Sequence, residues 1–228
     1  MFEPVSIIPS QEDWDFSGGV GASYYHNARK GGRPLAPGME QLDEARRISN
    51  DEGGAHFEMA GEYLTGIPWP GRAGWTAWKE KSVDLPPDIQ VRAGLSGPHL
   101  FVYQRDHDDL YFLFGTPGAR PRECLFWGWL LGAEAKYLCP KKWSLHPRFP
   151  ASHNIKAKFL HPLDRERGLL WPDGTVARPW GAHVTVPLVK KLWPRPDGWP
   201  LRSCGLPYWT DDQDWINREG ETTREEDG

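Results

Sequence analysis

A short alternating segment, Pro87-Asp88-Ile89-Gln90-Val91-Arg92, lies in the first half of the chain. Successive side chains of a β-strand point to opposite faces, so Asp88, Gln90 and Arg92 share one face and the two aliphatic residues between them share the other. We therefore expect a strand whose apolar face joins the core and whose polar face carries the chemistry of the protein.

A helical pattern precedes this strand. Its apolar residues fall at i, i+3, i+4 and i+7, which is the stripe of an amphipathic helix: Phe57, Ala60, Gly61 and Leu64. Glu58 lies at the edge of that stripe. The pattern begins near Met39, is interrupted at residues 50–54 and stops at Thr65-Gly66, where a glycine followed by a proline is a typical helix end.

A helix carboxylate, a strand carboxylate and a neighbouring cation are the parts of a metal-dependent phosphodiesterase site. Mg²⁺ prefers oxygen ligands, and it polarises a phosphoryl group and activates a water. The sequence predicts that Glu58 and Asp88 hold the metal, that Gln90 assists with a neutral oxygen and that Arg92 grips the scissile phosphate. The prediction requires the two carboxylates to meet, with neither buried in an unrelated salt link.

The order of these four residues resembles the PD-(D/E)XK, or restriction-endonuclease-like, superfamily, in which an acid and a lysine usually stand at the positions of Gln90 and Arg92. Two later segments, Gly128-Trp129-Leu130-Leu131-Gly132-Ala133-Glu134-Ala135-Lys136 and Lys158-Phe159-Leu160-His161-Pro162-Leu163, look like conserved blocks of a little-characterised family of phage and prophage proteins. The match covers roughly residues 39–163. The resemblance implies a restriction-endonuclease-like fold and Mg²⁺-dependent phosphodiester hydrolysis of DNA by a phage-associated protein.

Two departures from that family favour an alternative function. Arginine stays protonated and cannot share in proton transfer as a lysine can, and Gln90 brings no negative charge. A catalytically inactive nuclease-fold module that binds nucleic acid or a protein partner is the alternative interpretation, and a structural role in the virion belongs to the same class.

Charge is unevenly distributed along the chain. The formal net charge is -4, but residues 211–228 hold eight acidic and two basic residues, whereas residues 133–195 hold twelve basic and four acidic ones. A basic surface suits a polyanion. Lys136, Lys141 and Lys142 are therefore predicted to contact the nucleic-acid backbone, and a dispersed, solvated distribution of these cations is the alternative.

Composition excludes several classes of protein. The three cysteines have neither CxxC nor CxxH spacing, so we expect no disulfide framework and a reducing cytoplasm, that of the host if the protein is phage-encoded. No apolar run reaches the roughly 18 residues of a membrane helix, so no membrane partner is expected. Asp106 to Asp109 are interpreted as a polar turn in preference to a metal cluster, and Trp129 as a core residue.

The predicted architecture is α+β, with a central mixed β-sheet flanked by helices. Residues 1–37 are predicted to form an irregular arm, 38–163 the nuclease-like core, 164–210 a Trp/Pro-rich extension that contacts a protein partner, and 211–228 an acidic, disordered tail. Within the core we expect a β-hairpin of residues 99–103 and 110–114, a buried strand over 124–131, a short helix over 132–136 and a closing strand over 157–160.

Overall fold

The computed structural model of the chain describes residues 3–32, 42–73, 83–94, 99–103, 106–138 and 152–181. All of them belong to the first of two units, Met1–Val186 and Pro187–Gly228. The predicted tail over 211–228 and much of the predicted extension over 164–210 lie outside the described residues.

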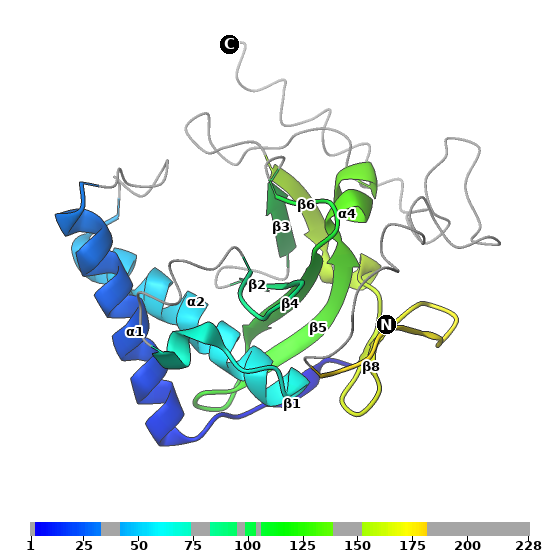
Figure 1. Cartoon of the computed structure of the whole chain (residues 1–228), viewed down its shortest axis with the longest axis horizontal. Coiled ribbons are helices and arrows are strands. Elements are labelled where there is room, and N and C mark those ends of the chain that lie inside the picture. Colours follow the sequence, from blue (N-terminus) through cyan, green and yellow to red (C-terminus); the bar gives the residue numbers. More distant parts are fainter. Residues whose placement is uncertain are drawn as a thin grey trace, which may run out of the picture. The chain divides into compact units, whose positions relative to one another are not determined.

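A four-stranded mixed sheet forms the centre of the first unit (Figure 1), with the strand order β1-β5-β4-β2. Strands β1 (Val5–Ile7) and β4 (Tyr111–Pro117) both run antiparallel to β5 (Cys124–Leu131), and β2 (Ile89–Ala93) runs parallel to β4. The α+β class and the mixed sheet are confirmed, as are the strands expected at Ile89–Ala93 and Cys124–Leu131.

Helix α2 (Glu44–Thr65) packs on the apolar face of β2. A Cβ on Gly61 would lie 3.3 Å from Val91 and 2.9 Å from Leu85, so the missing side chain allows helix and strand to approach closely. The helix begins at the Asp43 cap and ends at Gly66, whose φ of 68° is the left-handed conformation that a glycine favours. The predicted helix end is confirmed, whereas the interruption expected at 50–54 is absent because the helix is continuous there.

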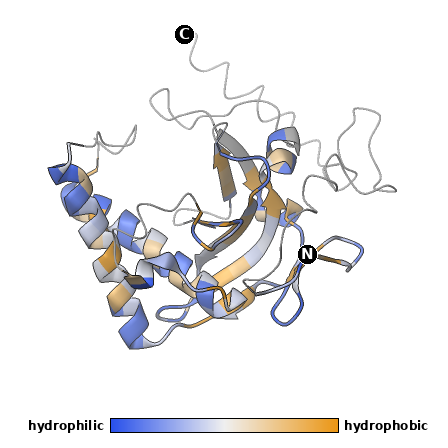
Figure 2. Ribbon diagram, viewed as in Figure 1, coloured by the Kyte–Doolittle hydropathy of each residue, from blue (hydrophilic) through white to orange (hydrophobic). Residues whose placement is uncertain are grey.

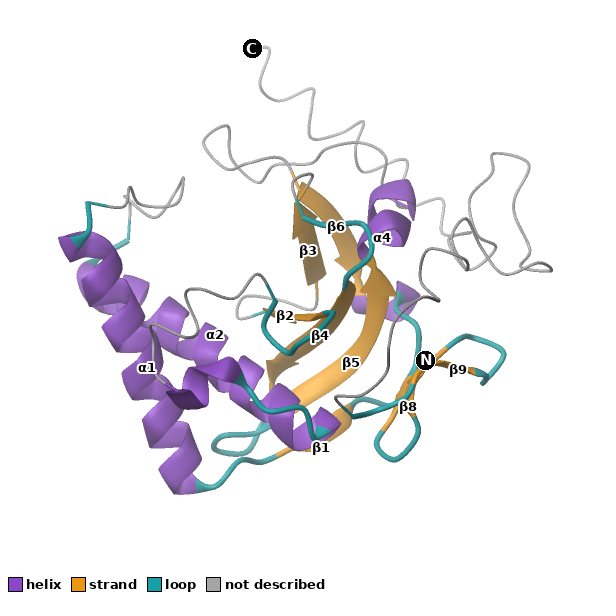
Figure 3. Ribbon diagram, in the orientation of Figure 1, coloured by secondary structure: helices purple, strands orange, loops and turns teal. Residues whose placement is uncertain are grey.

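The irregular arm expected over residues 1–37 is wrong for most of its length, because Gln11–Lys30 form the 20-residue helix α1 (Figure 3). Ser10 caps it by accepting a hydrogen bond from the Asp13 amide at 3.1 Å. Two of its glycines, Gly18 and Gly21, lie where a Cβ would contact α2, whereas Gly19 has open space around it. A Cβ on Gly21 would lie 2.6 Å from the backbone oxygen of Asp51, so α1 and α2 cross more closely than larger residues would allow.

The expected hairpin of residues 99–103 and 110–114 does not form. Strand β3 (His99–Tyr103) pairs antiparallel with β6 (Ser152–Lys156) in a separate two-stranded sheet. Strand β4 instead lies between β2 and β5, and Tyr111 to Thr116 are buried on both faces. A central strand already has two neighbours, so no edge of it remains free for β3.

The C-terminal part of the described chain is a small three-stranded antiparallel sheet: β7 (Leu163–Asp164), β8 (Gly168–Leu170) and β9 (Val176–Arg178). Residues 157–160 form no closing strand, since Ala157–Phe159 are a 3₁₀ turn. The core boundary predicted at residue 163 is also wrong, because the first unit extends to Val186 and Trp171 packs on Trp129 with ring centroids 5.0 Å apart.

The core lies between the central sheet and α2, where the strands are coloured as hydrophobic in Figure 2. Trp129, Phe112, Phe114 and Phe126 are fully buried, so Trp129 is a core residue as expected. Cys124 is buried too, and burial raises the pKa of its thiol to about 12. The described residues contain no helix long and apolar enough to cross a membrane.

Candidate functional site

The polar face of β2 carries Gln90 and Arg92, as the alternation predicts. Ile89 and Val91 are 0% and 5% exposed, whereas Gln90 and Arg92 remain partly exposed. Strand β4 pairs with β2 in register, and the Arg92 guanidinium carbon lies 5.3 Å from the centre of the Phe112 ring. The buried ring supports the cation from one side.

Asp84, which precedes β2, is the carboxylate that meets this face. Its Oδ2 accepts hydrogen bonds from the Gln90 side-chain amide and, at 2.7 Å, from the backbone N–H of Val91. Burial raises its pKa to about 6, and the charge of Asp106 acts in the same direction. Arg92 and the two hydrogen bonds oppose that shift without cancelling it.

Asp106 joins two of the predicted site residues that come from different elements. Its Oδ2 lies 3.3 Å from Arg92 Nη2 and accepts a hydrogen bond from the Tyr103 amide at 2.9 Å, and its backbone oxygen accepts one from Lys136 Nζ. Lys136 belongs to the short helix α4 (Gly132–Leu138), which the sequence predicted, and it also forms an ion pair with Asp108 at 2.6 Å. Arg92 and Lys136 therefore belong to a single polar cluster.

We call these side chains the Asp84 cluster, defined by Asp84, Gln90, Arg92, Asp106, Asp108 and Lys136. It contains three carboxylates and two cations, so one negative charge is in excess when every group is ionised. Like charges that are not fully compensated keep a proton on a carboxylate more readily. A polyanion gains affinity for such a cluster only when that excess is offset by a bound cation or by a proton.

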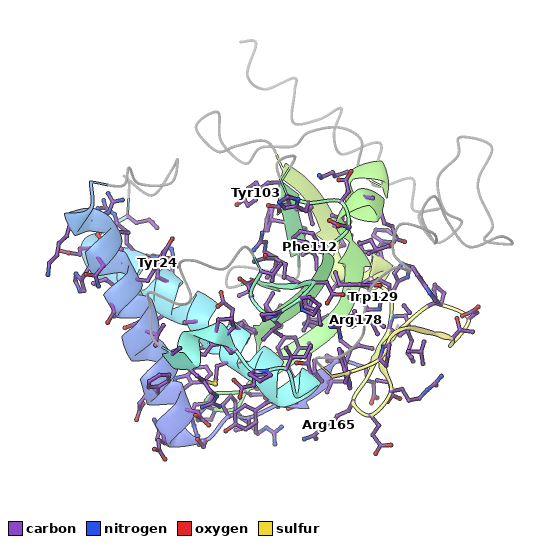
Figure 4. The ribbon with its side chains drawn as sticks, viewed as in Figure 1. Tyr24, Tyr103, Phe112, Trp129, Arg165 and Arg178 are labelled. Atoms are coloured by element: carbon purple, nitrogen blue, oxygen red, sulfur yellow. The ribbon has the colours of Figure 1, made fainter. Side chains whose placement is uncertain are left out.

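Asp88 does not satisfy the condition set for it as a metal ligand, because it is buried in a salt link. Arg178 of β9 donates from Nε to Asp88 Oδ1 at 2.8 Å, and its Nη2 lies 2.8 Å from the same oxygen. Asp88 is 6% exposed and Arg178 1% exposed. Figure 4 labels Arg178 of the small C-terminal sheet and Trp129 of the central strand β5.

Glu58 also has a local partner. It is 7% exposed, and its Oε2 accepts a hydrogen bond at 2.8 Å from the indole N–H of Trp69, which is itself 1% exposed. One turn further along α2, Glu62 accepts the Trp69 backbone N–H at 3.0 Å. Both acids thus bond to the chain that follows α2, and the role predicted for Glu58 as a metal ligand stays a prediction.

Lys141 and Lys142, the other two lysines predicted to contact nucleic acid, lie outside the described residues. Within the ranges that the structure describes, no group of three or more His, Cys, Asp or Glu side chains is arranged to hold a metal ion.

Sequence reasoning missed Asp84, the carboxylate that bonds to Gln90 and to the Val91 amide. One signal in the sequence could have pointed to it: Asp84 comes shortly before the Pro86-Pro87 pair, and β2 begins shortly after that pair. Leu85 and Ile89 exchange two backbone hydrogen bonds of 2.9 and 3.0 Å, so the chain folds back between them and returns Asp84 to the strand. The alternation of residues along the strand identifies Asp88. It cannot identify a residue outside the strand that a turn brings back beside it.

The two sequence blocks that suggested a phage-related family form a packed junction. Trp129 of the first block and His161 of the second exchange backbone hydrogen bonds of 3.1 and 2.9 Å. His161 Nε2 lies 2.6 Å from Glu134 Oε1, and these side chains are 1% and 0% exposed. Neither side chain reaches solvent, and the pair links the segment before β7 to α4.

Comparisons with family models, with curated proteins and with solved structures found no match for this chain.

Proposed function

We propose that the Asp84 cluster is a phosphodiester site for nucleic acid, of the restriction-endonuclease-like type, in which Asp84 takes the role that the sequence suggested for Asp88. The observation that carries this proposal is the set of contacts at Asp84, whose carboxylate is hydrogen-bonded by Gln90 and affected by the charge of Arg92. A partly buried carboxylate whose pKa is raised beside a specific cation is a feature of functional sites.

Each side chain of the cluster has a separate part in this function. Arg92 and Lys136 neutralise phosphate charge and hold the backbone of the nucleic acid, as planar and point-charge cations respectively. Asp84 orients the group that attacks phosphorus. The raised pKa of Asp84 means that this carboxylate is only half ionised at about pH 6 and ionises fully at higher pH.

The oxygen donors of the cluster fit a hard divalent cation such as Mg²⁺. Asp84 supplies a carboxylate and Gln90 an amide oxygen, and water completes the coordination of Mg²⁺ in many sites of this kind. Such an ion, when bound, lowers the charge of the cluster and polarises the phosphoryl group. The excess of carboxylates over cations favours this fit.

Cleavage by the full-length chain tests the proposal. Supercoiled and single-stranded DNA are incubated with the protein in Mg²⁺, in Mn²⁺ and in EDTA, and the products are separated by electrophoresis. We expect cleavage that depends on the divalent ion and disappears in Asp84→Asn. Asp109→Asn, which changes an exposed carboxylate in the neighbouring turn, is the matched control and keeps the activity.

The inactive nuclease-fold module remains the second candidate function, and a specific observation favours it. Asp84 already accepts two hydrogen bonds within the chain, and Asp106 is paired with Arg92. Intact DNA under every condition, together with DNA binding that weakens with salt and survives EDTA, supports this candidate over hydrolysis. A protein that neither cuts nor binds nucleic acid contradicts hydrolysis and the nucleic-acid-binding form of the module, and it leaves the form that binds a protein partner.

A further inference from the structure

The ion pair between Asp88 and Arg178 joins two parts of the chain that are 90 residues apart. Asp88 belongs to the turn from Leu85 to Ile89, immediately after Asp84, and Arg178 belongs to β9 of the C-terminal sheet. The pair therefore connects that sheet to the segment that presents the site carboxylate.

A contribution to the stability of the folded protein explains this ion pair poorly. Asp88 Oδ2 is buried and makes no hydrogen bond to any residue that the structure describes. Arg178 Nη2 is buried too and lies 2.8 Å from Asp88 Oδ1, but it makes no contact with hydrogen-bond geometry to a described residue. A buried ion pair whose remaining polar atoms are unsatisfied gains little over an apolar pair of the same size, and its documented uses include fixing one arrangement among several.

The arrangement that the pair fixes is that of the turn. Leu85 and Ile89 bond to each other through two backbone hydrogen bonds, and the Asp88 carbonyl accepts the Tyr111 amide of β4 at 2.9 Å. Asp84 then reaches across the turn to the Val91 amide at 2.7 Å. Every one of these contacts depends on where the segment between Asp84 and Ile89 lies.

We infer that Arg178 is a positioning residue: by pairing with Asp88 it holds the turn that places Asp84 beside Gln90 and Arg92. The inference deepens the proposed function, on which its consequence for activity rests. The C-terminal sheet is in this view a part of the site, although none of its residues contacts the Asp84 carboxylate directly.

Hydrogen exchange of single amides tests the positioning role without any substrate. The double variant Asp88→Asn/Arg178→Gln removes both charges and leaves no charge buried alone, with a shorter polar side chain at position 178. We expect the Leu85, Ile89 and Val91 amides to exchange at least tenfold faster than in the natural chain. The Gly118 amide, which bonds to the Glu123 carbonyl at 2.8 Å in a different turn, is the reference and keeps its rate.

Two controls separate local from general effects. Arg165→Gln changes an exposed arginine near β7 (labelled in Figure 4) and is expected to leave all these amides unchanged. Arg178→Lys keeps the charge and loses the planar fork, so an intermediate acceleration is expected. Equal acceleration of Gly118 and of the turn amides in the double variant, or no acceleration at all, overturns the inference.

Activity gives the second readout. If the natural chain cuts DNA, we expect kcat of the folded double variant to fall at least tenfold with KM changed less than twofold, because the misplaced group acts on the reacting phosphate. A folded double variant with unchanged kcat contradicts the inference. A natural chain that shows no activity contradicts the proposed function alone, and the amide exchange rates then still decide whether Arg178 positions the turn.

Discussion

Two carboxylates of this protein, Glu123 in the turn between β4 and β5 and Asp84 before β2, have opposite pKa shifts. Hydrogen bonds from Arg120 and Ser6 lower the pKa of Glu123 to about 2, whereas burial raises that of Asp84 to about 6. Both residues follow the same chemistry of carboxylates, so the difference comes from their surroundings.

The partners of the two groups explain the contrast. Glu123 accepts hydrogen bonds from Ser6 Oγ at 2.7 Å and from Arg120 Nε at 3.0 Å, and one of these donors is charged. The two hydrogen bonds to Asp84 come from a neutral amide side chain and a backbone N–H. Glu123 is therefore stabilised where it lies, and Asp84 is held in a place that costs free energy. Such a cost is expected where a group serves function.

Removal of the arginine near each carboxylate is expected to give the largest difference between the two regions, measured as the rate of DNA cleavage. Arg92→Gln removes the cation that we propose grips phosphate, so we expect the rate of DNA cleavage to fall by about 100-fold or more, the usual effect of removing one donor that stabilises the transition state. Arg120→Gln removes the partner of Glu123 and leaves that rate unchanged. Rates are measured on variants whose circular dichroism matches the natural chain, and a similar loss in both variants would break the comparison.

Neutral replacement of each carboxylate is expected to change stability in opposite directions. Asp84→Asn keeps an oxygen that accepts both hydrogen bonds and removes the partly buried charge. The free energy of unfolding at pH 7 therefore rises by about 1–3 kcal/mol, the value of a pKa shift of this size after allowance for screening. Glu123→Gln weakens charge-assisted hydrogen bonds and lowers Tm. Thermal and urea unfolding measure both changes, and a destabilised Asp84→Asn variant would contradict the assignment.

The pH dependence of stability sharpens the same contrast. The folded-state pKa of Asp84 lies above its ordinary value of 3.8, so the native state binds the proton more tightly and its stability falls as pH rises from about 4 to about 6. The folded-state pKa of Glu123 lies below 4.5, so its contribution is present above that pH and is lost as pH falls toward about 2. Subtracting the unfolding curve of each neutral variant isolates the two slopes, and slopes of equal sign would be inconsistent with these surroundings.

The smallest effect is expected from a single lysine at the edge of the cluster. Lys136→Gln removes one phosphate contact, so the slope of log affinity for DNA against log salt concentration falls by about one. Lys30→Gln removes the same charge from the exposed end of α1 and leaves the slope unchanged. Binding is measured by fluorescence anisotropy at several salt concentrations, and equal slopes for the two variants would indicate that the charge acts only through the net charge of the protein.

Periodicity within single elements predicted the fold where the signal was local. The alternation around Ile89 and Val91, the apolar stripe around Phe57 and the run from Cys124 to Leu131 are each confirmed, since each depends on side chains only a few residues apart. The pairing of β3 with β6 depends on which strand edges are occupied in the folded chain. No local pattern contains that information.

The candidate site was predicted only in part, for a related reason. The strand pattern predicts Gln90 and Arg92. Asp84, however, is placed by the turn between Leu85 and Ile89. Asp88 forms an ion pair with Arg178, a residue 90 positions later. Helix α1 was missed for a similar reason, because the close approach of Gly21 to Asp51 of α2 cannot be read from the sequence of residues 1–37 alone. In each of these cases the deciding partner lies outside the strand or helix whose pattern was analysed.

The indole N–H of Trp129 donates to two carbonyl oxygens at once, that of Pro162 at 2.9 Å and that of Leu170 at 3.1 Å. Both acceptors lie beyond the large central strands, near or within the small C-terminal sheet. A shortened form of the protein made for crystallisation or spectroscopy must therefore extend at least through Arg178. A form that ends earlier, at residue 163 for example, would lack the Leu170 carbonyl that accepts from the buried Trp129 and the Arg178 side chain that pairs with Asp88.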